Sequence, residues 1–237
     1  MPGRLVRLQL SRYNGFMTTR SLLLELFERL SAHFGPCHWW PGDTPFEIMV
    51  GAILTQNTNW ANVEKAIANL KEAGALSLAA MSELSKPELA ELIRPAGYYN
   101  IKADRLGNLL ELLCGEWGGD LDGFLAQPRE TLRETLLSVK GIGPETADSM
   151  VLYAAAKPIF VVDAYTHRIL NRHDIIDDSH DYHQIQDLFM DNLDEDVQLF
   201  NEFHALIVYC GKEFCKKRRP ACGACPLAGY NEIGSCP

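Results

Sequence analysis

The chain has 237 residues, 47% of them hydrophobic, which is enough to bury the core of one large domain or two smaller ones. Its formal net charge of −9 argues against a uniformly basic nucleic-acid-binding surface, although a local basic patch can still bind phosphate. No apolar run reaches the roughly 20 residues that span a bilayer, and no secretory signal opens the chain. We therefore expect a cytoplasmic protein that is neither secreted nor attached to a membrane.

Helical patterns dominate the chain after an irregular, basic lead at residues 1–16, for which Met17 is an alternative natural start. Apolar residues recur at helical spacing from residue 20 to 34, and a capping box at residues 44–47 predicts the start of the next helix. Further helices are predicted over 59–70, from a capping box at Ser85, from Asn100 to about Trp117, and over 129–138, 144–156, 163–172, 181–192 and 195–210. The strand-like run at 159–162 cannot form a sheet alone, so we expect a buried connector in an all-α fold.

Residues 136–156, LLSVKGIGPETADSMVLYAAA, predict two helices joined by a very short turn. Gly141 and Gly143 flank Ile142, which would anchor the turn in the core, and glycine permits a positive φ and a close backbone approach. Pro144 then opens a helix whose free N–H groups and dipole attract an anion. Gly141 and Gly143 are thus candidates for gripping a DNA phosphate without reading sequence. The alternative is an ordinary helical hairpin with a glycine turn.

Motifs in this hairpin and outside it make the sequence similar to a known family. They occur in a consistent order and are Pro45–Phe46–Glu47, Leu54–Thr55–Gln56–Asn57–Thr58, the run from Gly97 to Ala103, Gly141–Ile142–Gly143–Pro144–Glu145–Thr146–Ala147, Val162–Asp163–Ala164–Tyr165–Thr166–His167–Arg168 and a cysteine-rich tail. Over roughly residues 20–237 the chain resembles the endonuclease III family of helix-hairpin-helix DNA glycosylases, which act in base excision repair.

The resemblance implies two helical domains with double-stranded DNA in the cleft between them. One would be a six-helix barrel over residues 37–157 that contains the helix-hairpin-helix motif. The other would combine residues 17–36 with residues 158–237 and carry an iron–sulfur cluster. The hairpin and Asp163 would lie at the mouth of the interdomain cleft. We further expect a monomer located at the nucleoid of a bacterial or archaeal cell.

One departure from the family pattern concerns residue 145. Bifunctional members carry a lysine directly before Thr-Ala in the hairpin helix, and its amine attacks the sugar C1′ to form a Schiff base. This chain has Glu145 there, and a carboxylate cannot form an imine, while Lys140 lies on the other side of the turn. The sequence therefore predicts a monofunctional glycosylase that uses water, with weak or absent AP lyase activity. Glu145 itself either is a solvated residue or lines the base pocket.

Asp163 matches the family's catalytic aspartate, 18 residues after Glu145. Cleavage of an N-glycosidic bond builds positive charge on the sugar, and a nearby carboxylate stabilises that charge and can orient or deprotonate water. An aspartate at this position also suits the N-cap of the helix that follows. The two roles are compatible.

The base pocket is predicted at Trp39, Trp40 and Pro41, where the aromatic rings either join the core or stack on an extruded base. Together with the lysine-free hairpin, these residues look similar to the 3-methyladenine glycosylase branch, whose alkylated purine bases are cationic. A cation over an indole gains up to about 2 kcal/mol. The resemblance thus favours an alkylated purine such as 3-methyladenine, and the alternative is a mismatch or damaged-pyrimidine glycosylase.

Gln56 matches the family residue that fills the gap left by the flipped base, so it is the candidate DNA wedge; otherwise it is a polar residue at a helix end. We expect Trp60 and Lys102 to be packing and surface residues.

Cysteines crowd the end of the chain, where the spacing Cys215-x6-Cys222-x2-Cys225 suits thiolate ligation of a metal centre. The family pattern closes with a fourth cysteine after five residues, whereas here Cys236 follows after ten. The resemblance favours a [4Fe–4S] cluster with Cys236 as the fourth ligand. Zinc and Cys210 are the respective alternatives.

Four basic residues, Lys216, Lys217, Arg218 and Arg219, lie between the first two of these cysteines. They form the local patch that the net charge conceals, and we expect them to bind DNA phosphates in a salt-dependent way. The alternative is a solvated charge run. Two other functions stay open: a bifunctional glycosylase that uses another lysine, and a non-catalytic module that binds damaged DNA.

Overall fold

A computed structural model describes residues 18–37, 39 and 42–230, so residues 1–16, Trp40, Pro41 and Cys236 lie outside it. Every regular element in this part of the chain is helical, which confirms the predicted all-α class. The α-helices are α1 (Thr19–Phe34), α2 (Pro45–Leu54), α3 (Trp60–Glu72), α4 (Leu78–Ser82), α5 (Lys86–Leu92), α6 (Tyr99–Glu111), α7 (Leu121–Ala126), α8 (Arg129–Ser138), α9 (Pro144–Ser149), α10 (Ala164–Arg172), α11 (Tyr182–Met190) and α12 (Val197–Glu213). Short 3-10 turns are η1 (Arg94–Ala96) and η4 (Cys222–Ala224), and π turns are η2 (Leu112–Glu116) and η3 (Met150–Ala154).

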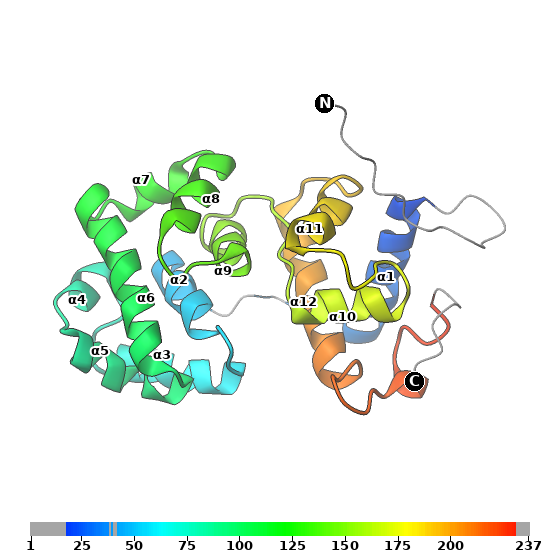
Figure 1. The fold of residues 1–237 in the computed structure, drawn as a ribbon, viewed down its shortest axis with the longest axis horizontal. Helices are drawn as coiled ribbons and strands as arrows, with labels where there is room; N and C mark the ends of the chain where they lie inside the picture. The colour runs from blue at the N-terminus through cyan, green and yellow to red at the C-terminus, as the bar shows by residue number, and fades with distance from the viewer. Residues whose placement is uncertain (1–17, 38, 40–41, 231–237) are drawn as a thin grey trace. The chain divides into compact units, whose positions relative to one another are not determined.

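The chain divides into two compact units. The central unit is residues 40–159, and the split unit combines residues 1–39 with residues 160–237. The boundaries predicted from the sequence fall after residues 36 and 157. Figure 1 shows α2 to α9 in the central unit, and α1 together with α10 to α12 in the split unit. Within the described part, no helix combines the length and the apolar character needed to cross a bilayer.

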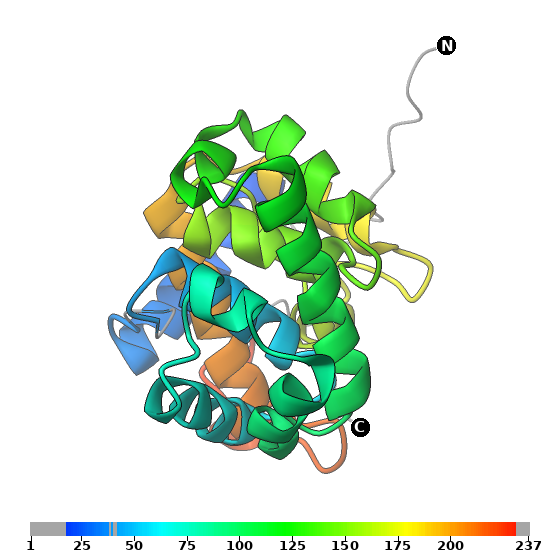
Figure 2. The same ribbon diagram turned by 90° about the vertical axis from the view of Figure 1, so that its left-hand side faces the viewer.

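Helix α2 forms the middle of the central unit, where it contacts α3, α6, α9 and η3 (Figure 2). Eight of its ten residues are buried, as expected of a helix surrounded by others. Thr44 caps it by accepting the Glu47 N–H at 3.1 Å. The predicted capping box does not close, because the Glu47 carboxylate instead accepts the Asp43 N–H at 3.2 Å and pairs with Lys71 Nζ at 2.9 Å.

Helix α6 corrects two expectations. Asn100 does not cap it, because the helix begins at Tyr99 after Tyr98, whose φ of 48° is left-handed. Lys102 is not a surface residue: it is 1% exposed, and its Nζ donates to the Leu54 and Ala96 carbonyls at 2.8 Å each. Its ammonium therefore closes the ends of α2 and η1, satisfying carbonyls that have no partner within their own helices.

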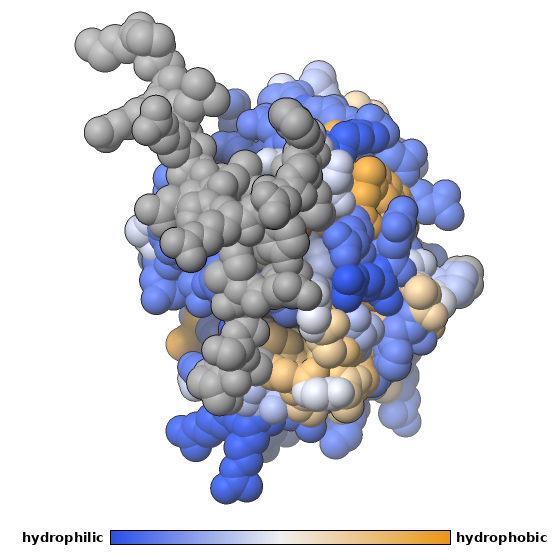
Figure 3. Space-filling model, turned by 90° about the vertical axis from the view of Figure 1, so that its right-hand side faces the viewer, coloured by the Kyte–Doolittle hydropathy of each residue, from blue (hydrophilic) through white to orange (hydrophobic). Residues whose placement is uncertain are grey.

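The split unit is built around α12, which packs against α1 and α10. The residues from 159 to 162 form no regular element and are buried, as expected for the connector. The Phe160 ring stacks on Phe189 with centroids 3.6 Å apart, and its carbonyl accepts from Gln186 Nε2 at 2.7 Å. On the face shown in Figure 3, hydrophilic side chains surround a smaller apolar region.

Candidate active site and nucleic-acid interface

The turn between α8 and α9 is held by a buried isoleucine between two glycines. Ile142 is 5% exposed, and its N–H donates to the Val139 carbonyl at 3.0 Å, which anchors the turn in the core of the central unit. Gly141 has a φ of 99°, in the region that favours glycine. Gly143 is the N-cap of α9 and offers no side chain to its N–H groups. Both glycines are exposed, so this stretch of backbone is open to a ligand.

Two side chains from other elements of the central unit brace this turn. Gln56, just after α2, donates from Nε2 to the Gly141 carbonyl at 3.1 Å and to the Thr146 hydroxyl at 2.9 Å. Arg105 on α6 donates from Nη1 to Gln56 Oε1. Gln56 therefore belongs to the support of the hairpin in this structure, and its role as a DNA wedge stays a prediction.

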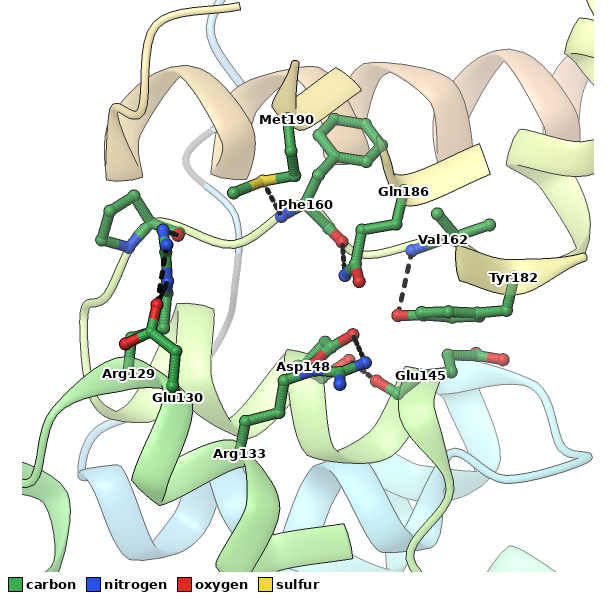
Figure 4. Close-up of polar contacts among 12 residues, drawn as sticks. Arg129, Glu130, Arg133, Glu145, Asp148, Phe160, Val162, Tyr182, Gln186 and Met190 are labelled. Atoms are coloured by element: carbon green, nitrogen blue, oxygen red, sulfur yellow. Dashed lines mark hydrogen bonds and ion pairs between the residues drawn. The ribbon is translucent and has the colours of Figure 1, made fainter. Parts of the chain in front are cut away.

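An ion pair joins the two helices of the hairpin (Figure 4). Arg133 on α8 donates from Nε to Asp148 Oδ1 at 2.6 Å and from Nη2 to Oδ2 at 3.2 Å. Asp148 is 0% exposed, so a planar, two-point contact fixes α9 against α8. Glu145 lies in the first turn of α9 and is exposed. Its negative charge suits the positive end of the helix dipole there.

Asp163 lies in the split unit and caps α10 through one of its two carboxylate oxygens. Oδ1 accepts the N–H of Tyr165 at 2.9 Å, the N–H of Thr166 at 2.7 Å and the Thr166 hydroxyl at 2.9 Å. The Thr166 hydroxyl in turn accepts the Asp163 N–H at 3.4 Å, which closes a capping box. Asp163 is therefore the N-cap of α10, and its catalytic role stays a prediction.

The second oxygen of Asp163 faces His204 on α12, with 3.6 Å between Oδ2 and Nε2. This distance suits an ion pair and exceeds a normal hydrogen bond. Burial would raise the pKa of Asp163, but His204 and the Thr166 donors outweigh it and hold that pKa below its ordinary value. Asp163 therefore stays ionised although its side chain is only 11% exposed. No motif pointed to His204, because it falls among the apolar core positions of α12.

Of the three residues expected at the base pocket, only Trp39 lies within the described part of the chain; Trp40 and Pro41 lie outside it. The Trp39 ring packs edge-on against Tyr209, with centroids 5.8 Å apart. Lys212 Nζ lies over the same ring, 5.4 Å from its centroid. The indole thus already contacts a cation, through residues of α12.

The cysteine loop is tied to α10, the helix that Asp163 caps. Arg168 Nε donates to the Cys215 carbonyl at 2.7 Å, and Arg172 Nη1 donates to the Cys215 sulfur at 3.1 Å. An N–H donor on sulfur suits a thiolate that ligates a metal centre. Across the described residues, no three metal-binding side chains are gathered at one point. The Cys210 and Cys225 sulfurs lie 3.8 Å apart, while Cys236 lies outside the described residues. The set of four cysteine ligands thus stays a prediction, with Cys210 as the alternative to Cys236.

The basic run follows Cys215 directly, and Lys216, Lys217, Arg218 and Arg219 are all exposed. Within the described residues, none of these four side chains forms an ion pair with a carboxylate. Arg172 donates to the carbonyls of Lys216 and Lys217 at 2.9 and 3.3 Å, so the backbone of the run is fixed while its charges face solvent.

The start of α6 adds an apolar surface that the sequence analysis missed. Tyr98 is 68% exposed and Ile101 is 51% exposed, and they are the exposed large hydrophobic side chains of the described chain. Arg105 and Asn108 follow at helical spacing on the same helix, and Asn108 Nδ2 donates to the Lys140 carbonyl of the hairpin at 2.8 Å. The helix predicted from Asn100 already contains Ile101, Arg105 and Asn108, but their spacing alone does not indicate that they lie next to the hairpin.

Known proteins match both the region that contains the hairpin and the cysteine loop. Residues 50–195 match the family model described as HhH-GPD superfamily base excision DNA repair protein. Residues 215–230 match the iron-sulfur binding domain of endonuclease III, so the cysteine loop is an iron–sulfur motif of the kind that binds a [4Fe–4S] cluster. A Methanocaldococcus jannaschii protein, whose name assigns it to the DNA repair glycosylases, is 42% identical over 211 residues, covering 88% of this chain and 95% of the relative.

Two solved structures show the same fold. A trapped endonuclease III–DNA covalent intermediate has a TM-score of 0.76 at 23% identity, with coverage of 89% of this chain and 94% of that one. An H. pylori 3-methyladenine DNA glycosylase bound to 1,N6-ethenoadenine has a TM-score of 0.70 at 29% identity, with coverage of 83% and 98%. The chain therefore belongs to the HhH-GPD superfamily of base excision DNA repair proteins and carries the iron–sulfur domain of endonuclease III.

Proposed function

We propose that this protein is a monofunctional DNA N-glycosylase that releases a damaged base by hydrolysis and leaves the strand intact. The observation that carries the proposal is the exposed carboxylate of Glu145 in the first turn of α9. Bifunctional relatives place the amine that forms a Schiff base at this point of the hairpin. A carboxylate offers no such nucleophile, so water is the remaining acceptor for the sugar.

Asp163 is the proposed catalytic residue. Loss of the base leaves an oxocarbenium-like sugar, and an ionised carboxylate stabilises it and can orient the attacking water. The low pKa of Asp163 supports this role, because the carboxylate is charged at neutral pH despite its burial. The capping bonds fix Oδ1, which leaves Oδ2 as the oxygen that can act on the sugar or the water.

An alkylated purine is the proposed substrate class. An H. pylori 3-methyladenine glycosylase bound to 1,N6-ethenoadenine has a similar fold, at 29% identity. Alkylated purine bases such as 3-methyladenine carry positive charge, which makes them good leaving groups that need little acid assistance. Aromatic rings such as the Trp39 indole can stack on an extruded base and attract a cationic one.

DNA binding is proposed to use the backbone of the hairpin at Gly141 and Gly143 and the basic run at 216–219. These sites contact phosphates and carry no sequence preference. Gln56 is the proposed wedge for the gap left by the flipped base. The exposed Tyr98 and Ile101 supply apolar groups of the kind that unstack a duplex.

The iron–sulfur cluster is proposed to have a structural role in this chain. Cys215, Cys222 and Cys225 would bind three of its irons, with Cys236 or Cys210 on the fourth. A bound cluster would add fixed ligation to a loop that Arg168 and Arg172 already hold against α10. The basic run of that loop would then meet DNA in a fixed position.

The test is a mass-spectrometric survey of bases released from alkylated, oxidised and deaminated duplex DNA, with the strand analysed in parallel. We expect alkylated purines in the released fraction, an intact abasic strand, and no release by D163N. Borohydride should trap no protein–DNA adduct with the wild type, whereas E145K, which restores the amine, should form one and E145Q should not. Adduct formation by the wild type, or full activity of D163N, would contradict the proposed mechanism.

A further inference from the structure

The two oxygens of the Asp163 carboxylate have different surroundings. All three hydrogen bonds from the first turn of α10 end on Oδ1, with donors at 2.7 to 2.9 Å. An oxygen with three donors has little capacity left for another partner. Capping therefore explains the position of Oδ1 and does not explain the position of Oδ2.

Oδ2 faces the imidazole of His204, 3.6 Å from Nε2. His204 belongs to α12, the helix that packs directly against α10, so the contact links two elements of the split unit. The His204 side chain is only 6% exposed and the Asp163 side chain 11% exposed. In such a site the electrostatic interaction between the two groups is much stronger than it would be in water.

His204 contacts Oδ2 of Asp163 and its own side chain is 6% exposed, so we assign it no contact with the substrate. Any effect on base release must therefore pass through the carboxylate, which turns about the Cβ–Cγ bond as one rigid, planar group. The capping bonds hold Oδ1, and the contact of His204 with Oδ2 restrains the same rotation from the other oxygen. Preorganised groups of this kind lower the cost of reorienting charge during the reaction.

We propose that His204 is a positioning residue for Asp163, which holds Oδ2 in the orientation that stabilises the sugar cation and directs the water. This inference rests on the proposed function of Asp163 and adds a residue that acts through it. The capping bonds restrain the carboxylate from α10, and His204 restrains it from α12.

The test compares H204Q, whose amide can reach Oδ2, with H204N, whose shorter amide cannot, and with H204F, which keeps a ring without a donor. Single-turnover base release from alkylated DNA and the DNA dissociation constant are measured separately. We expect H204F and H204N to lower the single-turnover rate on the order of 10- to 100-fold, with an unchanged dissociation constant. H204Q should recover most of the rate.

The buried Leu206 of α12 provides a control, because L206A loses core packing without touching the carboxylate. It should lower the melting temperature and leave the single-turnover rate of the folded protein unchanged. If H204F does not fold, the comparison of H204Q with H204N decides. Equal rates for those two variants, or a full rate for H204F, would overturn the inference while leaving the proposed function intact. A wild type that releases no base would overturn both.

Discussion

An added methyl group should lower the stability of the fold at Gly141 and leave it nearly unchanged at Gly143. At Gly141 a Cβ would approach Cγ of Arg105 to 2.5 Å, and the backbone φ of 99° is strained for any L residue. At Gly143 the φ is −97°, and nothing lies within 4 Å of the added Cβ. G141A and G143A therefore form a matched pair with equal chemistry and different surroundings.

The loss of folding free energy expected for G141A is the sum of two contributions. A left-handed alanine costs roughly 1–2 kcal/mol. Moving the Arg105 side chain also disrupts its hydrogen bond to Gln56, which is worth about 1 kcal/mol. The sum of about 2–3 kcal/mol should lower the melting temperature by roughly 4–12 °C for a chain of this size. G143A should stay within about 1 kcal/mol, since weaker capping and a less flexible unfolded chain offset each other.

Thermal and urea unfolding measure the stabilities, and fluorescence anisotropy with abasic-site DNA measures the affinity. We expect G143A to bind DNA about tenfold more weakly, which corresponds to about 1.4 kcal/mol, because its methyl group occupies the space beside the free N–H groups. Equal stability of G141A and the wild type would refute the steric reasoning. Wild-type affinity of G143A would show that no phosphate binds at this part of the hairpin.

Three other predictions follow from single contacts. R133M should cost about 3–5 kcal/mol because it removes the guanidinium from the fully buried Asp148, whereas D148N should cost less because Arg133 is 20% exposed; urea unfolding compares the two. The pKa of Lys102 is lowered to about 8 by burial and by Arg105, so the unfolded chain binds more protons above that pH. Wild-type stability should thus rise relative to K102M between pH 8 and 10.5, by at most about 3 kcal/mol, and a parallel pH dependence would contradict this. Replacing residues 216–219 by serine should reduce the slope of log affinity against log salt by up to about 3.6, and an unchanged slope would exclude phosphate contacts.

The helices were predictable where local signals agreed with burial. Proline and threonine marked the start of α2, and glycines marked the hairpin, because these residues restrict the backbone wherever they occur. The start of α6 was missed because Asn100 looked like a cap, while the chain instead turns through the left-handed Tyr98. Nothing local favours a tyrosine in that conformation, so only the surrounding packing can select it.

The candidate site was predictable in its motifs and not in its supporting contacts. Lys102 looked like a surface residue because a lysine on a helix usually is one; its burial depends on two carbonyls from segments 6 and 48 residues away. His204 and Arg105 were missed for the same reason. Each acts through a partner from a distant part of the chain, and helical periodicity carries no information about which segments meet.

Helix α10 shows why these supporting contacts matter for the chemistry. Its N-terminus is fixed by the Asp163 carboxylate, and Arg168 and Arg172 further along it hold the backbone and sulfur of the cysteine loop. The helix has nine residues, about two and a half turns, and its backbone hydrogen bonds connect its two ends. A displacement of the cysteine loop that pulls on Arg172 would therefore also displace the backbone N–H groups that hold Oδ1. The proposed structural role of the cluster then has a physical route to base release without any change in its oxidation state.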